Sequence, residues 1–494
     1  MAGTLSSQLV EALVSRGDDL LIDSHDGTLT CDQLLGHAED VRAFFAGRGS
    51  EVVLFTADHG IGSRALYLAL LLCGITAAPV HASTPRHRLE AIASALGATE
   101  IVTAPTGGLV PPRAHTVAPT GTGPGAAPRT AEGVAPAYVL HTSGSTGRPK
   151  GVPIPGVALQ AYLEFITRAL DWAPGARFSA TFDLSFDLAL HDLLVPVLTG
   201  GTSCPSHPKL AVLPHLYTQQ HGITEWFSVP GAAAFARQAR SLEPGSLKAL
   251  DRSLFAGEAL QSADAAYWAA ATGTSVFNLY GPTELTLAAT WHEYREGESY
   301  PTVPIGRAFD HLRARTGSGR DPDELLLTGV QMFAGYLDPA DDAEAFETDD
   351  EGTVWYRTGD RVRSCPAGYL FQGRLDTQVK VGGYRIDLMD VEHAFRGDPD
   401  VDESVAFLDP STQRLCVALQ PRADAGSRTQ AQWRQLATGL LPRYMVPSRV
   451  FVLPDLPRNN NGKLDRSRTA LAALDTAPAR SAAGADCSRP GRVS

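Results

Sequence analysis

The sequence predicts an α/β protein with a large amino-terminal domain and a smaller carboxy-terminal domain. Up to about residue 300, short apolar segments rich in β-formers alternate with helical segments, which is typical of α/β sheets. Several predicted strands end in polar or Gly-containing loops, where open α/β sheets bind ligands. From about Pro301 the pattern changes to shorter strands with Gly turns. At 494 residues the chain is also longer than one hydrophobic core usually holds.

The first elements are predicted from capping residues and breaks. An amphipathic segment that contains Leu9 and Leu13 comes first, and Thr30 is predicted to cap a helix that runs through Phe45. The next elements alternate in type: a strand at residues 52–55, a helix at 65–73 and a strand at 75–80.

The middle of the chain continues this alternation after an interruption. Residues 105–136 are rich in Pro, Gly, Ala and Thr, so we expect a loop or flexible connection there. A helix follows at about 158–170, and a strand that begins at Phe178 would deliver Asp183 and Ser185 at its end. Further elements are expected as a helix near 191–198 and strands at 224–229, 253–255, 276–280 and 324–328.

Composition and charge exclude several classes of protein. The 42 Lys and Arg against 54 Asp and Glu give a net charge of −12, which argues against nucleic acid as the main partner. The longest apolar run, residues 65–73, is too short to span a bilayer, and the amino terminus lacks a signal-peptide pattern. We therefore expect a cytoplasmic protein with no membrane or nucleic-acid partner. Six cysteines lie far apart without metal-ligand spacing, as expected for reduced thiols: Cys31, Cys73, Cys204, Cys365, Cys416 and Cys487.

A Ser/Thr/Gly-rich loop follows the apolar residues 138–140. Its glycines allow backbone N–H groups to turn toward an anion, its hydroxyls add donors, and Lys150 adds a positive charge. This pattern predicts a polyphosphate-binding loop made of Thr142, Ser143, Gly144, Ser145, Thr146, Gly147 and Lys150. It is not the P-loop of ordinary NTPases, because Arg148-Pro149-Lys150 stands where that motif needs Gly-Lys-[Ser/Thr]. A Ser/Gly-rich surface turn is the alternative interpretation.

Several motifs occur in a fixed order along the chain: the loop 142–151, Tyr280-Gly-Pro-Thr-Glu284, Tyr356-Arg-Thr-Gly-Asp360, the segment 373–386 and Asn461-Gly-Lys463-Leu-Asp-Arg466. Together they resemble the acyl-adenylate-forming superfamily. The resemblance is strongest to the adenylation domains of nonribosomal peptide synthetases and to free-standing amino acid:carrier-protein ligases such as prolyl- and D-alanyl-carrier-protein ligases. It covers about residues 20–468.

The resemblance implies a reaction in two halves that uses ATP and Mg²⁺. A carboxylate attacks the α-phosphate of ATP to give an acyl-adenylate and pyrophosphate, and a thiol then takes the acyl group. The loop 142–151 would hold the β- and γ-phosphates, Thr283 would contact the α-phosphate, and Glu284 would bind Mg²⁺. The other implied nucleotide contacts are Gly257, Glu258, Asn278, Tyr280 near the adenine, Gly281, Asp360 at the ribose hydroxyls and Arg374 beside it.

The resemblance also implies a mobile second domain. Lys463 would be the catalytic lysine that offsets charge in the transition state. Asp376 would be the hinge of the small domain, and the loop 381–385 would line the tunnel used for thioester formation. The implied organisation is an adenylation core at 1–373 that includes a small barrel-like β subdomain, a mobile α+β domain at 374–469, and a disordered tail at 470–494.

Two stretches depart from the family pattern. Gly156 stands where the family often has a histidine, and the common Gly-Glu-Leu is Asp323-Glu324-Leu325. Neither change removes a group that the chemistry needs.

Asp183 matches the family's anchor for the amino group of α-amino acids. A buried carboxylate is suited to an ammonium, because a fatty or aryl acid would leave it unpaired. The remaining positions that match the family's substrate pocket are Leu184, Asp187, Ser228, Leu254, Ala256, Leu279, Leu287 and Ala288. They predict a small, mostly apolar pocket, and Asp187 and Ser228 favour a proline-like or other small amino acid with a polar N–H or O–H. If Asp187 points away from the pocket, proline or alanine would fit.

The expected acceptor is the phosphopantetheine thiol of a separate carrier protein, because no Gly-Gly-x-Ser site follows Arg466. Two alternatives stay open. An acid:CoA ligase would use coenzyme A as the thiol, and a catalytically silent nucleotide-binding protein would keep only the fold. Asp183 disfavours the first, and the intact Lys150, Glu284, Asp360 and Lys463 disfavour the second.

Overall fold

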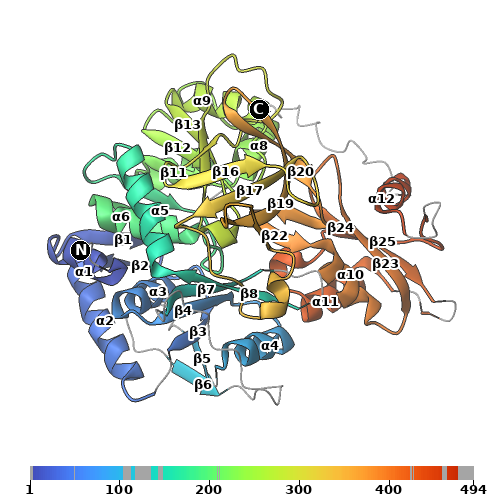
Figure 1. The fold of residues 1–494 in the computed structure, drawn as a ribbon, viewed down its shortest axis with the longest axis horizontal. Helices are drawn as coiled ribbons and strands as arrows, with labels where there is room; N and C mark the ends of the chain where they lie inside the picture. Colours follow the sequence, from blue (N-terminus) through green and yellow to red (C-terminus); the bar gives the residue numbers. More distant parts are fainter. Residues whose placement is uncertain are drawn as a thin grey trace, which may run out of the picture. The chain divides into compact units, whose positions relative to one another are not determined.

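The computed structural model describes residues 4–48, 51–98, 100–103, 113–116, 135–142, 148–207, 210, 212–422, 425–426, 428–458 and 464–476 (Figure 1). The chain divides into two compact units. Unit 1 comprises Met1–Asp390 and Thr438–Met445, and unit 2 comprises Val391–Ala437 and Val446–Ser494. Residues 374–390, which the sequence assigns to the smaller domain, group with unit 1 in this division.

A nine-stranded sheet forms one layer of unit 1. Its centre, from β13 through β12, β11, β9 and β10 to β1, is parallel, and antiparallel strands lie at both edges. Ser228 pairs with Phe255 and Phe255 with Asn278, so the carboxyl ends of β11 and β12 are level and β13 continues further, to Tyr280. The strands in spatial order are β15 (Arg307–Ala308), β14 (Thr290–Glu293), β13 (Ser275–Tyr280), β12 (Arg252–Phe255), β11 (Glu225–Ser228), β9 (Arg177–Ala180), β10 (Thr202–Pro205), β1 (Leu20–Ser24) and β2 (Gly27–Thr30).

A six-stranded sheet forms a second layer. Its spatial order is β6 (Arg113–Thr116), β5 (Glu100–Thr103), β3 (Val52–Ala57), β4 (Thr76–His81), β7 (Pro136–Thr142) and β8 (Lys150–Pro155). The strands from β5 to β7 run parallel, and β6 and β8 pair antiparallel at the edges. The expectation of an irregular connection over residues 105–136 is wrong for β6, because backbone pairing with β5 holds these four residues as an edge strand.

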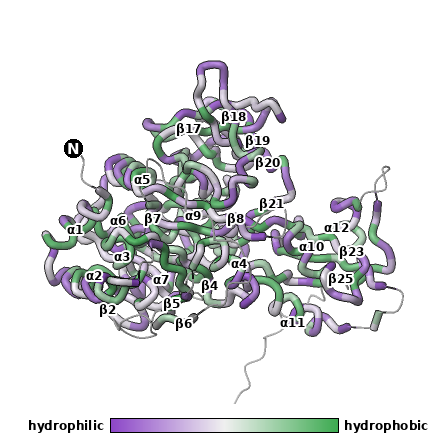
Figure 2. The backbone as a smooth tube through the Cα atoms, turned by 60° about the horizontal axis from the view of Figure 1, so that its bottom comes forward, coloured by the Kyte–Doolittle hydropathy of each residue, from purple (hydrophilic) through white to green (hydrophobic). Residues whose placement is uncertain are grey.

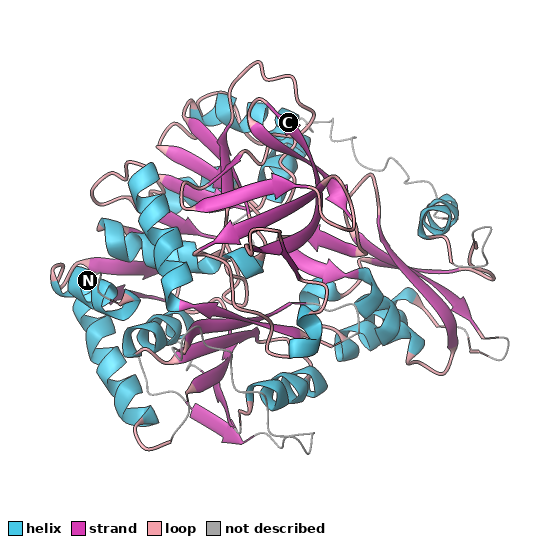
Figure 3. Cartoon of the chain, in the orientation of Figure 1, coloured by secondary structure: helices cyan, strands magenta, loops and turns pink. Residues whose placement is uncertain are grey.

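Helices pack on both faces of these two sheets (Figure 3). Contacts link α1, α3, α5 and α6 to one another or to the strands of both sheets, so these helices share the core between the layers. Residues of α7, α8 and α9 form a separate core with Trp226 on the other face of the nine-stranded sheet, and α4 packs against the six-stranded sheet. The helices are α1 (Leu5–Val14), α2 (Cys31–Phe45), α3 (Ile61–Cys73), α4 (Arg86–Leu96), α5 (Gly156–Ala169), α6 (Ala189–Thr199), α7 (Pro214–His221), α8 (Gly231–Ala239) and α9 (Ser262–Thr272).

Local signals in the sequence explain where these helices begin and end. Thr30 and Gln33 form a capping box at the start of α2, as the sequence predicts. Gly74 ends α3 with a left-handed φ of 68°, a conformation that glycine adopts at low cost. The interior of α3 is buried on all sides, whereas α2 mixes hydrophobic and hydrophilic residues along its length (Figure 2).

The last part of unit 1 is a smaller antiparallel sheet that carries one side of the candidate site. It contains β16 (Leu312–Thr316), β17 (Glu324–Gly329), β18 (Phe346–Thr348), β19 (Val354–Cys365) and β20 (Gly368–Arg374). A hairpin follows, formed by β21 (Gln378–Val381) and β22 (Tyr384–Asp387). Short 3₁₀ turns occur at η1 (Thr283–Leu285) and η2 (Pro339–Asp342).

Unit 2 is built on a three-stranded sheet of β23 (Val401–Leu408), β24 (Leu415–Pro421) and β25 (Arg449–Val452). Helix α12 (Arg466–Asp475) packs on β23, where Ala473 joins Phe407 and Phe451 in the core. Helices α10 (Leu388–Arg396) and α11 (Gln430–Leu440) and the turn η3 (Arg443–Met445) contain the points where the chain passes between the units. Helix α12 extends into the segment for which the sequence predicts a disordered tail, and residues 477–494 lie outside the described residues.

Two expectations from the sequence, about membrane-spanning helices and about cysteines, can be compared with the structure. Among the described residues, no helix is both long and apolar enough to cross a membrane. The five described cysteines are free thiols: Cys31, Cys73, Cys204, Cys365 and Cys416.

Candidate active site

The predicted ribose contact, Asp360, lies buried on β19 and has protein partners on both oxygens. Tyr280 at the end of β13 donates its hydroxyl proton to Asp360 Oδ2, and Arg374 Nη1 lies 2.5 Å from Oδ1. Arg374 also binds both oxygens of Asp376 at 2.7 Å. Burial acts to lower the pKa of Arg374, but Asp360 and Asp376 outweigh it and raise the pKa above its ordinary value. Three predicted site residues and the predicted hinge residue thus form one hydrogen-bonded group.

A narrow cavity lies beside this group at the carboxyl ends of β12 and β13. Five residues predicted from the sequence line it, namely Gly257, Glu258, Asn278, Leu279 and Tyr280. Lys380 of β21 lines it as well, with its ammonium 5.3 Å from the centre of the Tyr280 ring. Burial lowers the pKa of Lys380. The motif at residues 373–386 contains this lysine, although the sequence alone predicts no role for it.

The predicted magnesium ligand Glu284 lies in η1 and is fully buried. Arg385 Nη1 lies 3.0 Å and 3.1 Å from its two carboxylate oxygens, and the Tyr336 hydroxyl donates to Oε1 at 2.7 Å. Burial alone would raise the pKa of Glu284, but Arg385 and Tyr336 together bring it below its ordinary value. Glu284 is therefore a charged carboxylate held by a cation and a phenol.

The turn between β21 and β22 approaches Glu258 through its backbone, because residues 382 and 383 are glycines. The Gly383 N–H donates to Glu258 Oε1 at 3.1 Å, and burial raises the pKa of Glu258. Gly383 has a φ of 86°, and a Cβ there would lie 2.7 Å from a methyl carbon of Val229. Only glycine therefore fits at this point of close approach.

Asp183 lies in the loop after β9 with 7% of its surface exposed. The expected strand ends earlier than predicted, at Ala180, because Asp183 bends the chain by accepting the N–H of Ser185 at 2.8 Å and its hydroxyl at 2.5 Å, both on Oδ1. The other oxygen, Oδ2, is buried without a hydrogen-bond partner in the described part of the chain. His81 Nε2 at 3.5 Å and His59 Nε2 at 3.8 Å face it.

The predicted substrate-pocket residues are all buried: Leu184, Asp187, Ser228, Leu254, Ala256, Leu279, Leu287 and Ala288. Both polar members have protein partners. Ser228 Oγ accepts the Trp226 indole N–H at 2.9 Å and donates to the Val229 carbonyl at 3.1 Å. Asp187 accepts from the Thr283 hydroxyl and the Leu188 N–H, and burial raises its pKa to about 7. Their contact with a polar substrate group stays a prediction.

A buried glutamine holds the turn that carries Leu287. Thr286 and Leu287 have φ values of 60° and 63°, which non-glycine residues adopt only with strain. Gln331 Nε2 lies 2.8 to 3.1 Å from three carbonyl oxygens on this turn, those of Leu285, Thr286 and Ala288. The Thr286 hydroxyl donates to the main-chain carbonyl oxygen of Gln331 at 2.8 Å. Sequence reasoning missed Gln331, because nothing local to it indicates this contact.

Two predicted elements lie partly or wholly outside the described residues. Ser143, Gly144, Ser145, Thr146 and Gly147 of the phosphate loop lie outside them, as does Lys463. The flanks of the loop are described: Thr142 ends β7 and pairs in register with Lys150, which begins β8. Lys150 Nζ lies 3.4 Å from Asp341 Oδ1. Gly281, the remaining predicted nucleotide contact, packs closely, since a Cβ there would lie 2.6 Å from Ala288 Cα.

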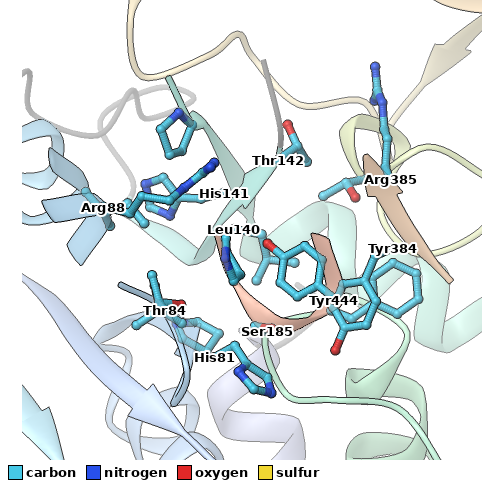
Figure 4. Close-up of a pocket in the computed structure, with 17 residues that line it drawn as sticks. His81, Thr84, Arg88, Leu140, His141, Thr142, Ser185, Tyr384, Arg385 and Tyr444 are labelled. Carbon is cyan, nitrogen blue, oxygen red and sulfur yellow. The ribbon is translucent and has the colours of Figure 1, made fainter. Parts of the chain in front are cut away.

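A second cavity in unit 1 lies between the flank of the predicted phosphate loop and the surroundings of Asp183 (Figure 4). Thr142, Thr283 and Arg385 line it from the side of the predicted phosphate loop, and His81 and Ser185 line it from the Asp183 side. Tyr384 and Tyr444, whose rings stack at 4.0 Å, line it too, together with Arg88 and His141. Burial lowers the pKa of His141 to about 4, so its ring is neutral at pH 7.

These features define a class of protein. Two buried carboxylates, Glu284 after the parallel strand β13 and Asp360 on β19, lie with several cations near the carboxyl ends of parallel strands, as expected for an enzyme that binds a nucleotide. The family model for AMP-binding enzymes matches residues 11–337. The chain belongs to this family and is an adenylate-forming ligase.

Relatives and solved structures agree with this assignment. The chain is 31% identical over 358 residues to a D-alanine–D-alanyl carrier protein ligase from Listeria monocytogenes, a match that covers 67% of this chain and 68% of the relative. It is 32% identical over 354 residues to an L-proline–[L-prolyl-carrier protein] ligase from Pseudomonas fluorescens, with 67% of each chain covered. The adenylation domain AlmE of Vibrio cholerae, solved with glycyl-adenosine-5'-phosphate, superposes with a TM-score of 0.81 at 25% identity, covering 96% of this chain and 98% of AlmE.

Larger relatives contain a similar region within longer chains. The chain spans only 3% of the cyclosporin synthetase of Tolypocladium inflatum and 33% of an isonitrile lipopeptide synthase of Streptomyces coeruleorubidus. The predicted family, fold class and ligase class are confirmed.

Proposed function

We propose that this enzyme activates a small amino acid as an aminoacyl-AMP and passes it to the phosphopantetheine thiol of a separate carrier protein. The observation that carries the proposal is the buried Asp183 carboxylate. One of its oxygens is satisfied by Ser185, and the other has no hydrogen-bond partner among the described residues. A half-satisfied buried carboxylate is costly unless a cation completes it, and the ammonium of an amino acid is such a cation.

In the first half-reaction, an oxygen of the substrate carboxylate bonds to the α-phosphorus of ATP, and the bond to pyrophosphate breaks. Asp360 would accept the ribose hydroxyls, with Arg374 and Tyr280 holding its position. Gly257, Glu258 and Asn278 would line the base side of the nucleotide. Thr283 would orient the α-phosphate, and Lys150 with the loop that precedes it would hold the outer phosphates.

Magnesium is the metal that this family chemistry implies, and the donor set fits it. No group of three acidic, histidine or cysteine side chains suited to a metal occurs among the described residues. Mg²⁺ is usually held by one or two carboxylates plus substrate phosphates, and Glu284 supplies one buried, charged carboxylate. The ion would neutralise charge on the phosphates, while Glu284 would hold it in place.

In the second half-reaction, the thiol loses its proton to solvent and its sulfur bonds to the acyl carbon, while the bond between that carbon and the AMP oxygen breaks and AMP leaves with the electron pair. The cavity lined by Tyr384 and Arg385 offers an approach for the thiol to the side of Thr283. This supports the predicted role of loop 381–385. Asp376 as the hinge and Lys463 as the catalytic lysine remain predictions.

A small amino acid suits the buried and mostly apolar pocket residues. The relatives' names support the same size range, since they specify D-alanine, L-proline and a glycyl adenylate. Ser228 and Asp187 are already bonded within the protein, so a plain small side chain fits at least as well as a polar one.

Amino-acid-dependent exchange of pyrophosphate into ATP tests the proposal. The panel contains glycine, D- and L-alanine, serine, proline, hydroxyprolines, piperazic acid and small β-amino acids, with aryl and fatty acids as controls. We expect exchange with one or a few small amino acids. Exchange with the control acids alone would overturn the role of Asp183, and transfer to coenzyme A in preference to a carrier protein would overturn the proposed acceptor.

A variant separates catalysis from binding. Lys463→Ala should lower exchange by about 100-fold or more while ATP still binds, because a cation at the reacting phosphate acts mainly in the transition state. Lys248→Ala, at an exposed lysine of the same unit as Asp183, is the matched control and should keep full activity. Equal exchange by the Lys463 variant and the control would remove Lys463 from the mechanism.

A further inference from the structure

Two histidines face Oδ2 of Asp183, the oxygen without a hydrogen-bond partner among the described residues, and the proposed reaction assigns them no role. His59 lies just before α3, and His81 is the last residue of β4. Their Nε2 atoms lie 3.8 Å and 3.5 Å from Asp183 Oδ2. The Asp183 side chain is 5% exposed, whereas the side chains of His59 and His81 are 35% and 19% exposed. Three elements that are distant in sequence therefore converge on a single carboxylate oxygen.

Hydrogen bonding determines which ring nitrogen of neutral His81 carries the proton. The backbone N–H of Ser83 donates to His81 Nδ1 at 2.9 Å. A nitrogen that accepts such a bond has no proton, so the proton of neutral His81 is on Nε2 and faces Asp183. Neutral His81 thus presents a weak donor to Oδ2 at a distance longer than a full hydrogen bond, and it leaves room on that oxygen for a stronger partner.

The charged and titratable groups around the histidines determine their charge. His59 is surrounded by Asp183, Arg64, His81 and Asp58, and Tyr444 and Tyr384 pack beside His81 and Asp183. Burial is the largest influence on His59, and the net effect of all these groups lowers its pKa. The pKa of Tyr444 is raised to about 12 and that of Tyr384 well above its usual value, so both phenols stay neutral. Near pH 7 His59 is therefore mostly neutral, and it gains charge in acid.

A metal ion does not explain the cluster. Two imidazole nitrogens and a carboxylate oxygen are a common ligand set, but no described group of three such side chains has an arrangement that holds an ion. The remaining cation that the cluster can hold is the one that the proposed function brings to Asp183.

We propose that His59, beside His81, couples amino-acid binding to proton release, so that the substrate ammonium binds Asp183 only when the His59 imidazole is neutral. This inference rests on the proposed function. An imidazolium at either position would lie within 4 Å of the oxygen that the ammonium needs, and two positive charges at that oxygen repel each other. By linkage, one proton released on binding lowers the apparent affinity up to about tenfold for each pH unit below the histidine pKa.

Kinetics between pH 5.5 and 8 test the coupling. In the exchange assay, the KM for the amino acid should rise toward low pH with a slope approaching one, while the KM for ATP stays nearly constant. The variant His59→Gln/His81→Gln keeps neutral amides at both positions and should make the amino-acid KM independent of pH. His292→Gln is the matched control. His292 lies on β14 and pairs with Glu298 at 3.0 Å instead of with Asp183, so this variant should keep the wild-type slope.

A measurement that needs no substrate complements the kinetics. Nuclear magnetic resonance of ¹⁵N-labelled histidine should show neutral His81 with its proton on Nε2. In Asp183→Asn, the pKa of His59 should fall, because the carboxylate that favours its charged form is gone.

The outcomes separate the two proposals. An active enzyme whose amino-acid KM is independent of pH, or a double variant that keeps the slope, overturns the coupling and leaves the proposed function intact. An unchanged His59 pKa in Asp183→Asn overturns it as well. Silence with every amino acid, together with the expected His59 shift, overturns the amino acid as the cation and leaves the electrostatic link between His59 and Asp183.

Discussion

The two sides of the reaction centre differ in how their carboxylates are partnered. On the nucleotide side, Asp360 is bonded to Tyr280 and Arg374, and Glu284 to Arg385 and Tyr336. On the amino-acid side, Asp183 has one satisfied oxygen and one open oxygen. Removing one partner of a paired buried carboxylate is strongly destabilising, whereas a carboxylate with an open oxygen already costs stability and is typical of a functional site. The difference therefore separates two carboxylates that are already paired within the protein from one whose second oxygen is left for a ligand.

The largest expected effect comes from removing the open carboxylate. Asp183→Asn should lower kcat/KM for the amino acid by about 100-fold or more, because a buried ammonium without its counter-charge costs about 3 kcal/mol. The KM for ATP should change little. Since Asn removes an incompletely paired charge, the free energy of unfolding should stay equal or rise, as urea denaturation would measure. A strongly destabilised variant with normal activity would contradict the comparison.

The second effect tests a paired carboxylate. Arg385→Met should lower the free energy of unfolding at pH 7 by about 3 kcal/mol, because it leaves Glu284 buried without its cation. In the wild type the pKa of Glu284 lies below its ordinary value, because Arg385 and Tyr336 stabilise the charged carboxylate. The contribution of the pair is therefore present above pH 4.5 and is lost as pH falls through the folded-state pKa.

Unfolding curves at pH 7 and pH 4 would show this pH dependence as a smaller difference between wild type and variant in acid. Arg313→Met, which removes a partly exposed arginine of β16, is a control that should cost less than about 1 kcal/mol. A difference that grows in acid would contradict the assignment of the effect to Glu284.

The third effect concerns the support beneath the substrate pocket. Gln331→Leu should cost about 2 to 3 kcal/mol, because it leaves buried carbonyls of the strained turn without a donor. Gln372→Leu, at an exposed glutamine of β20, should change stability by less than about 0.5 kcal/mol. Thermal unfolding of both variants would measure the difference. Equal melting temperatures would show that Gln331 does not hold the turn.

The smallest effect distinguishes a pocket hydroxyl from a structural one. Ser228→Ala should leave the amino-acid KM within about twofold and cost about 1 kcal/mol of stability, because the Trp226 indole N–H loses its acceptor. A large loss of affinity with unchanged stability would instead show that the hydroxyl faces the substrate, as the sequence pattern suggests.

Much of the fold and some of the site were predictable because their signals are local. Thr30 caps α2 through a contact three residues away, and the helix predicted at residues 65–73 is the end of α3. The residues predicted around the nucleotide, such as Asn278 and Tyr280, lie together because each ends or follows a parallel strand whose pairing is regular.

The parts that sequence reasoning missed depend on contacts between distant segments. Nothing near His59 or His81 in the sequence indicates Asp183, since they meet only when α3, β4 and the loop after β9 pack together. Gln331 and Arg385 likewise have partners 43 to 101 residues away. Strand β6 could not be predicted, because it lies in a stretch rich in turn-forming residues. Its extended backbone depends on pairing with β5.

The clamp formed by Gln331 has a consequence for engineering. Its amide nitrogen donates to main-chain oxygens of the turn, its amide oxygen pairs with the His311 ring, and the side chains of Leu287 and Ala288 take no part in these contacts. These two side chains can therefore be exchanged without removing what fixes the turn. Leu287→Ala should enlarge the space available to an amino-acid side chain while the scaffold stays in place, which makes it a natural first substitution for redirecting the enzyme to a larger substrate.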